Sequence, residues 1–205
     1  MIVNGYVTLD RLKEAVGSKN NVHDNDFERA IGAASRKIDE WTGRYFYQDA
    51  APSARLYRAS DSFYVCVGDF DSTAGVSVKT DNDSDGVFET TWTSEQWQAE
   101  PFVRYNLKPY TRISATTRVQ GFPFWSLRPL VEVTATWGWG AVPPQVEQAC
   151  EYAATLFYRA KDQYGASIGL IDQTEKMTAD PLKVAMELVR EYAVEGGTLY
   201  KPCSC

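Results

Sequence analysis

Histidine is nearly missing from this chain of 205 residues, which contains only His23. A metal centre built from several histidines is therefore excluded, and a catalytic triad would depend on that one side chain. The sequence also has no glycine-rich phosphate loop and no Gly-x-Ser-x-Gly elbow. We expect His23 to be an ordinary surface residue and the protein not to be an enzyme. An enzyme that uses an unrecognised pair of carboxylates stays as an alternative.

Long hydrophobic runs are also missing, although 44% of the residues are hydrophobic. No run approaches the roughly 20 residues that cross a membrane, so no membrane partner is expected. The first residues lack the basic start and apolar core of a secretion signal, and we expect a protein made and kept in a reducing cytoplasm.

Cysteine is sparse, with four residues. Cys66 and Cys150 are expected to be buried free thiols. The terminal Cys203 and Cys205 are too close together for a zinc hairpin and are expected in a solvated tail.

Positive charge is in deficit, with 21 basic and 27 acidic residues and a net charge of −6. A general nucleic-acid binder needs a basic face, so this balance argues against one, while it permits a surface beside which DNA can slide. The charge is uneven: residues 61–100 hold nine acidic side chains and one basic one, and residues 101–130 hold five basic and none acidic. Either neighbouring strands pair these charges, or they make a polar contact with another subunit.

Two stretches have apolar residues that step by 4, 3, 4, 3, 4, the spacing of one stripe on a helix. We expect the two stripes to pack on each other. Their members are Phe27, Ile31, Ala34, Ile38, Trp41 and Tyr45, and Val146, Cys150, Ala153, Phe157, Ala160 and Tyr164. The opposite face of the first stripe, which includes Arg36 and Asp39, is expected to face solvent or a neighbouring subunit.

Capping residues delimit four expected helices, at about 9–16, 25–44, 144–164 and 181–195. The residues that begin or end them are Thr8, Gly17, Asp24, Gly43, Pro144, Gly165, Asp180 and Gly196.

Between the second and third helices the pattern changes to short β-branched and aromatic runs separated by turn residues. The expected strands are 56–58, 63–67, 76–80, 87–92, 113–119 and 130–137. The fold class predicted is α+β: a small antiparallel bundle of about four helices with an inserted antiparallel β-rich subdomain. The predicted parts are 1–50 and 141–205 for the helices and C-terminal tail, and 51–140 for the insert.

Aromatic residues are abundant in the insert, and most are expected in its core. The exception is the segment from Gly121 to Trp125, where Pro123 interrupts an aromatic cluster. We interpret this segment as a loop that would mark a contact surface if its rings are exposed.

One motif is typical of a metal site. Asp81, Asp83, Asp85 and Glu89, with the Val87 carbonyl, alternate around a glycine as calcium-binding loops do. However, the twelfth position of the loop is a tryptophan, and the flanks are strand-like. The alternatives are a structural calcium ion held by the four carboxylates, and a hairpin turn whose Asp-Gly pair supplies the geometry.

Three segments together resemble the head-to-tail adaptor (connector) proteins of tailed bacteriophages, in the version with a large β insert. They are residues 5–13, residues 33–46 and the run from Trp137 to Pro144 with the helix through Arg159. Each segment is short, but they occur in the family's order and spacing across most of the chain. The last five residues do not align.

The resemblance implies a structural virion protein at the capsid–tail junction. Such adaptors form a ring, typically a dodecamer, below the portal protein, and they dock a tail-side head-completion or stopper protein. Genomic DNA passes through the lumen without specific binding. The C-terminal residues Leu199, Tyr200, Lys201 and Pro202 are expected to reach the portal, because chain ends are often ordered by a partner.

The other function considered is a carbohydrate- or cell-surface-binding module with a calcium-stabilised β domain, as the aromatic insert and the acidic motif suggest.

Overall fold

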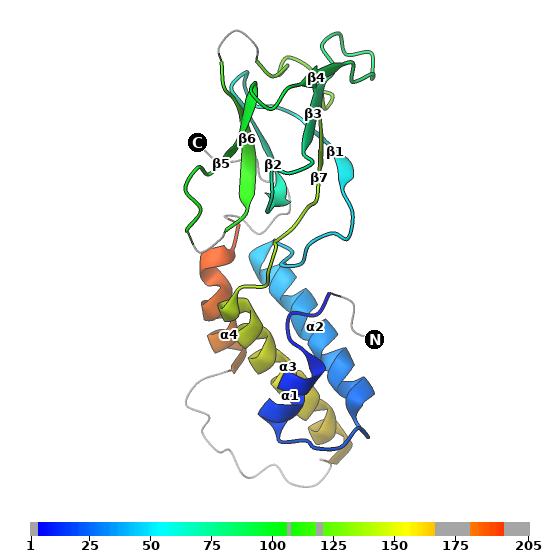
Figure 1. Ribbon diagram of the computed structural model, residues 1–205. Coiled ribbons are helices and arrows are strands. Elements are labelled where there is room, and N and C mark those ends of the chain that lie inside the picture. The colour runs from blue at the N-terminus through cyan, green and yellow to red at the C-terminus, as the bar shows by residue number, and fades with distance from the viewer. Residues whose placement is uncertain (1–3, 106–107, 118–120, 167–180, 195–205) are drawn as a thin grey trace. The chain divides into compact units, whose positions relative to one another are not determined.

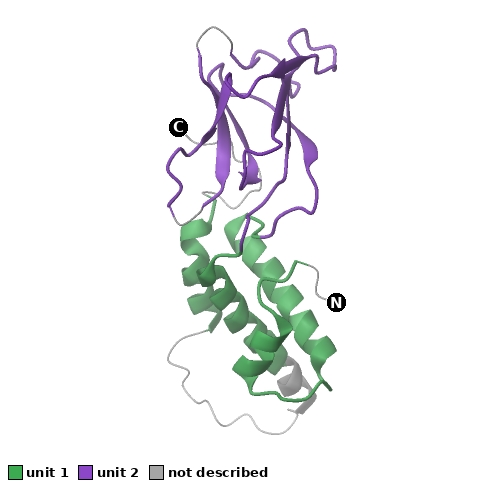
Figure 2. Cartoon of the chain, in the orientation of Figure 1, with its two compact units in different colours: residues 1–46, 142–201 green, residues 47–141, 202–205 purple. Residues whose placement is uncertain are grey.

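We describe the protein from a computed structural model, which defines residues 4–105, 108–117, 121–166 and 181–194. The chain forms two compact units (Figure 2). The first, the helical unit, comprises residues 1–46 and 142–201. The second, the β unit, comprises residues 47–141 of the described chain. The predicted class, α+β with an inserted antiparallel β subdomain, is confirmed.

The helical unit contains α1 (Leu9–Val16), α2 (Asp24–Thr42), α3 (Pro144–Ala166), α4 (Pro181–Val189) and a 3₁₀ turn, η2 (Arg190–Tyr192) (Figure 1). Thr8 caps α1 as predicted, since its side chain accepts a hydrogen bond from the N–H of Arg11. Gly17 and Gly43 end α1 and α2 in the left-handed conformation. Pro144 and Pro181 open α3 and α4.

Four expected helix boundaries were wrong. Asp24 is the first residue of α2 rather than its cap, and its carboxylate pairs with Lys13 Nζ at 2.8 Å. Helix α2 ends at Thr42, not Arg44, and α3 continues one residue past Gly165. The last helical segment ends at Tyr192, short of the expected stop at Gly196, which like Asp180 lies outside the described residues.

The two predicted stripes pack on each other, because α2 lies along α3 and forms the main contact of the helical unit. Four members of the first stripe are fully buried, and three of the second are: Phe27, Ile31, Ala34 and Ile38, with Val146, Cys150 and Ala153. Burying each larger apolar side chain contributes about 1.5–3 kcal/mol, so this seam stabilises the unit substantially.

The β unit contains seven strands: β1 (Ser53–Tyr57), β2 (Tyr64–Phe70), β3 (Ser77–Thr80), β4 (Thr90–Trp92), β5 (Trp97–Glu100), β6 (Tyr110–Ala115) and β7 (Val131–Ala135). They form two antiparallel sheets, ordered β1-β7-β3-β4 and β2-β6-β5. Figure 1 shows the sheets facing each other. Both contribute to one core, which includes Val65, Val78, Trp92, Ile113 and Trp137.

Six of these strands overlap the predicted runs. The remaining strand, β5, was not predicted. It has only four residues, and its Ala and Glu have low strand propensity. The run 87–92 was too long, since only Thr90–Trp92 is a strand and Val87 lies exposed in a loop.

The two ends of the β unit's chain are paired with each other. Gln48 and Gly138 form an antiparallel bridge, and Trp139 N–H donates to the Tyr47 carbonyl at 3.3 Å. The N–H of Asp49 donates to the Trp137 carbonyl at 2.8 Å. The segment that enters the unit and the segment that leaves it are therefore held side by side.

The tryptophans on either side of Gly138 anchor this pairing in the core. Trp137 is buried and its indole N–H donates to the Ser53 carbonyl at 2.8 Å, while that of Trp139 donates to Asp69 Oδ2 at 3.0 Å. Gly138 lies between them with φ +101°, a conformation that suits glycine.

Cys150 is buried and free, as expected, and burial raises the pKa of its thiol to about 11. Cys66 is half-buried and disulfide-bonded, so the expectation of a free thiol there was wrong. Its partner lies outside the described residues, as do Cys203 and Cys205.

Replacing Gly138 by alanine is expected to destabilise the β unit by about 2–5 kcal/mol. The left-handed backbone costs about 1–2 kcal/mol without glycine. The new Cβ would also collide with the Tyr47 carbonyl, and such overpacking costs about 1–3 kcal/mol more. Denaturant unfolding measures the change.

The matched control is Gly75→Ala. Gly75 also has positive φ, +74°, but no atom lies within 4 Å of the position its Cβ would take. Equal losses from the two substitutions would show that the Tyr47 contact is unimportant.

Candidate functional site

The acidic motif forms the loop between β3 and β4, which pair as an antiparallel hairpin. Within the described residues, one candidate metal cluster is found, and it consists of the four predicted residues Asp81, Asp83, Asp85 and Glu89. Each offers a carboxylate oxygen within 4.8 Å of the others. The structure thus brings together the whole predicted ligand set within a hairpin, so both sequence interpretations describe the same loop.

Asp81 organises the loop from a buried position. Its Oδ1 accepts from Ser84 N–H at 2.6 Å and its Oδ2 from Gly86 N–H at 2.8 Å. Burial by itself would raise the pKa of Asp81, but these N–H donors and the neighbouring Asp83 outweigh it and lower the pKa.

The three exposed carboxylates also accept backbone hydrogen bonds. Asp83 Oδ1 accepts from Asp85 N–H, Asp85 Oδ1 from Val87 N–H, and Glu89 Oε1 from Asn82 N–H. The Asp85 N–H lowers the pKa of Asp83, but partial desolvation and the charges of Asp85 and Glu89 outweigh it and raise the pKa. The backbone thus offsets part of the repulsion between these groups.

An all-oxygen set of four carboxylates is a donor set that calcium accepts. Each carboxylate oxygen carries two lone pairs, so the turn hydrogen bonds leave capacity for an ion. The residues present therefore fit calcium, and they also form a complete turn without it.

Part of the uneven charge along the sequence is paired within the β unit. Glu100 and Arg112 are direct neighbours on β5 and β6, with 3.2 Å between Oε2 and Nε. Lys79 and Glu132 are direct neighbours on β3 and β7, at 3.4 Å. Arg104 pairs with Asp71. These contacts favour cross-strand pairing as the explanation.

The aromatic segment 121–125 divides in two. Phe122, expected to be part of a loop surface, is buried and stacks on Trp92 with 4.4 Å between ring centroids. Phe124 and Trp125 are exposed. The segment is thus a loop whose first ring anchors it and whose later rings face solvent.

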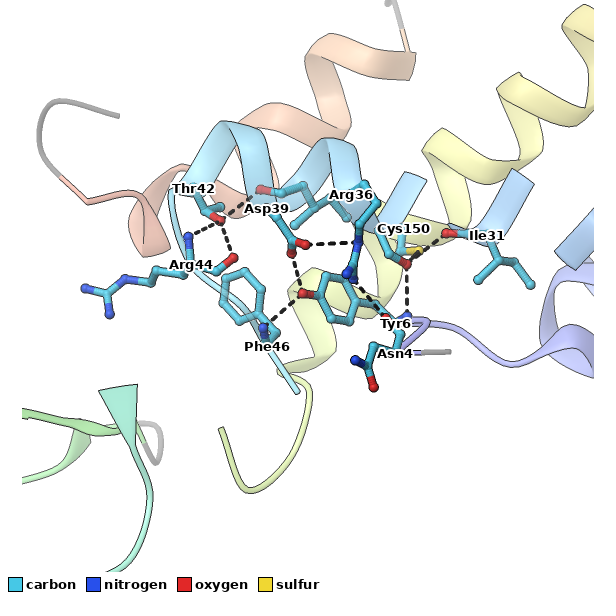
Figure 3. Close-up of polar contacts among 11 residues, drawn as sticks. Asn4, Tyr6, Ile31, Arg36, Asp39, Thr42, Arg44, Phe46 and Cys150 are labelled. Carbon is cyan, nitrogen blue, oxygen red and sulfur yellow. Dashed lines mark hydrogen bonds and ion pairs between the residues drawn. The ribbon is translucent and has the colours of Figure 1, made fainter. Parts of the chain in front are cut away.

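A buried polar cluster in the helical unit was not predicted (Figure 3). Asp39, expected on the outer face of α2, is buried, and the Tyr6 hydroxyl donates a short hydrogen bond to its Oδ1. That hydroxyl accepts the N–H of Phe46 at 3.0 Å. Ser35 Oγ accepts the N–H of Tyr6 at 3.1 Å and donates to the Ile31 carbonyl at 2.8 Å.

This cluster joins the N-terminal segment, α2 and the residue that precedes the β unit. Arg36 Nε lies 3.1 Å from Asp39 Oδ2, but the N–H is not aligned with that oxygen, which accepts no hydrogen bond. Burial therefore raises the pKa of Asp39, although Tyr6 and Arg36 oppose the rise. The sequence pattern that could have predicted this cluster is the polar series Ser35, Asp39 and Thr42, which lies at helical spacing beside the apolar stripe.

His23 occupies the position before α2, half-exposed, with Nδ1 3.7 Å from an Asp26 carboxylate oxygen. Leu199, Tyr200, Lys201 and Pro202, expected to bind a partner, lie outside the described residues. No helix in the described part of the chain has the length and apolar character of a membrane span.

No family model and no curated protein sequence matches this chain. Solved structures do match. A chain in the neck of an empty gene transfer agent particle, computed with C6 symmetry, aligns with a TM-score of 0.59 and 16% identity over 96% of this chain and 95% of that one. The fold is that of a particle-neck chain.

A chain from the virion of a native gene transfer agent particle aligns with a TM-score of 0.53 and 17% identity, covering 96% of both chains. At these identities the likeness establishes the fold. It extends over nearly the full length, so the helical unit and the β unit both belong to the shared architecture.

Replacing Tyr6 by phenylalanine is expected to destabilise the helical unit by about 1–3 kcal/mol, because the buried Phe46 N–H loses its acceptor and Asp39 loses its hydrogen-bond donor. Denaturant unfolding followed by circular dichroism measures this. Tyr152→Phe is the control, since its hydroxyl accepts an exposed bond from Gln148. Equal effects of the two substitutions would contradict a special role for Tyr6.

The loop is expected to rearrange only at strongly acidic pH. Because the folded-state pKa of Asp81 is lowered, its contribution to stability is present above the ordinary value of 3.8 and is lost as pH falls through the lower folded value. The amide resonances of Ser84 and Gly86 should titrate together below pH 3.8. A midpoint at or above the ordinary value would contradict the assigned hydrogen bonds.

Proposed function

We propose that this chain is a head-to-tail adaptor, a structural and non-enzymatic protein of a tailed phage or phage-like particle. The observation that carries the proposal is the shared fold with a chain from a particle neck, which extends over both units. It agrees with the resemblance of three sequence segments to adaptor proteins. The two lines of support are separate, since one rests on the backbone and the other on residue patterns.

In this role the chain forms a ring homo-oligomer, a dodecamer in the typical adaptor, below the portal protein. The ring extends the DNA channel and docks a tail-side head-completion or stopper protein. The net charge of −6 suits a lumen through which genomic DNA slides, because like charge prevents binding to phosphates. The protein would be made in the bacterial host cytoplasm and reside at the capsid–tail junction, with no membrane partner.

We assign portal contact to the C-terminal residues Leu199, Tyr200, Lys201 and Pro202. The ground is general: chain ends are often ordered by a partner, and these four residues join two apolar side chains to one positive charge.

We also propose that the loop of Asp81, Asp83, Asp85 and Glu89 holds a structural calcium ion in the assembled particle. The support is the convergence of four carboxylates within 4.8 Å. The ion would neutralise the repulsion that raises the pKa of Asp83.

One observation favours a second function, a carbohydrate- or cell-surface-binding module. Trp125 is exposed in a loop joined to the acidic loop by a hydrogen bond between Ser84 and Ser126. An exposed indole beside a calcium loop is a surface on which a sugar ring can stack. This function predicts a monomer or small oligomer with calcium-dependent glycan affinity.

The adaptor role is tested by size-exclusion chromatography with light scattering, on the full chain alone and mixed with the portal protein of the same particle. We expect a ring mass, either spontaneously or only with portal. A chain that stays monomeric with portal and binds glycans would instead support the second function. Deleting residues 199–202 should abolish portal binding without changing the circular dichroism of the chain.

Calcium binding is tested by native mass spectrometry with and without chelator, and by thermal unfolding. We expect one bound ion and a rise in Tm at millimolar calcium, because a ligand of the native state stabilises it. Asp83→Asn with Asp85→Asn should abolish both effects, while Glu95→Gln, an exposed acid outside the loop, should not. Absence of a bound divalent ion at millimolar calcium contradicts the calcium proposal.

A further inference from the structure

Two loops meet at one end of the β unit. Thr80, the last residue of β3, is paired with Val131, the first residue of β7. The loop that leaves β3 and the loop that enters β7 therefore lie at the same sheet end. The Asp81 N–H donates to the Leu130 carbonyl at 3.0 Å, and the Ser84 and Ser126 hydroxyls are 3.3 Å apart. We call residues 83–89 and 124–128 the loop-end surface.

This end lies away from the places where the chain enters and leaves the unit. At the opposite end of the same sheet, Ser53 of β1 pairs with Ala135 of β7, next to the paired segments 47–49 and 137–139. The loop-end surface is thus not part of the connection to the helices.

The loop-end surface exposes several large apolar side chains. Trp125 is 60% exposed and Leu127 is 86% exposed, and Phe124 and Val87 are also in solvent. The loop that carries Phe124, Trp125 and Leu127 is anchored, because the adjacent Phe122 is buried and stacks on Trp92 in the core. Exposed aromatic and aliphatic groups on a fixed base are typical of contact surfaces, where Trp is a frequent energetic centre.

The charge of the same surface is negative. Among its described residues, Asp83, Asp85 and Glu89 are exposed carboxylates, and Arg128 is the one basic side chain. Such a surface repels nucleic-acid phosphates and anionic lipid headgroups. It is complementary to a protein surface with Lys or Arg side chains around an apolar centre, which is the usual arrangement of a protein–protein interface.

We propose that the loop-end surface is a docking site for a protein partner that presents basic side chains around an apolar contact. Trp125 and Leu127 enter the partner's apolar centre, and the carboxylates of the acidic loop face its basic rim. The proposal does not depend on a ring or on a portal, so it goes beyond the adaptor role.

The test is selection from a random peptide library in mRNA display against the immobilised full chain. Chelator is present so that the carboxylates keep their full charge. We expect enriched peptides to combine Lys or Arg with Leu, Ile or aromatic residues. Their Kd should rise at least about tenfold for Trp125→Ser with Leu127→Ser, because interface anchors of this kind contribute more than 1.4 kcal/mol. Asp83→Asn with Asp85→Asn should weaken binding and reduce its salt dependence.

The matched control is Phe102→Ser with Tyr105→Ser, an equally exposed pair in the loop between β5 and β6, at 66% and 77%. All variants must retain the wild-type Tm, and this pair must bind the selected peptides as the wild type does. No enrichment, enrichment of neutral or acidic peptides, or unchanged binding by the Trp125 variant overturns the proposal. If the wild type binds a glycan array rather than peptides, and the Trp125 variant does not, the proposal is also overturned and the surface is assigned to a carbohydrate.

Discussion

The pairing of the β unit's two chain ends is the constraint on which the architecture depends. Helices α2 and α3 must pack along each other to bury their stripes, yet 101 residues, from Gly43 to Pro143, separate them in sequence. A flexible connection of that length would carry a closure cost. Folding of the β unit offsets this cost, because Gln48 and Gly138 bridge entry and exit and the buried indoles of Trp137 and Trp139 hold the bridge in place.

This arrangement gives each unit its own core and its own kind of surface. The helical unit carries the α2–α3 seam and, at the end of α2, the buried cluster around Tyr6 and Asp39. The β unit carries two loops far from its connection to the helices. Because its sheets are completed by their own hydrogen bonds, those loops are free to differ in sequence without disturbing the helical core.

In the acidic loop, backbone N–H groups offset the repulsion between neighbouring carboxylates. Four carboxylates gather within 4.8 Å, and each accepts at least one backbone N–H in the turn. Adjacent carboxylates therefore indicate a cation less strongly than their number suggests. The same groups give the loop-end surface its negative charge, so metal binding and partner docking there would influence each other.

Periodicity by itself determined the two helical stripes, because burial of a helix face requires apolar residues every three or four positions. Local chemistry likewise determined the helix boundaries at Thr8, Gly17, Gly43 and the two helix-opening prolines, because capping acts within one helical turn. The four members of the acidic cluster also followed from sequence, since they lie within nine residues of a single hairpin.

Only the tertiary structure decided what depends on distant neighbours. Asp39 is polar and was expected in solvent, yet Tyr6, 33 residues away, buries it and provides its hydrogen bond. Strand β5 has little propensity of its own and exists because β6 supplies its partners. Phe122 and Trp125 are three residues apart in one loop, and the nearby Trp92 determines that the first is buried while the second faces solvent.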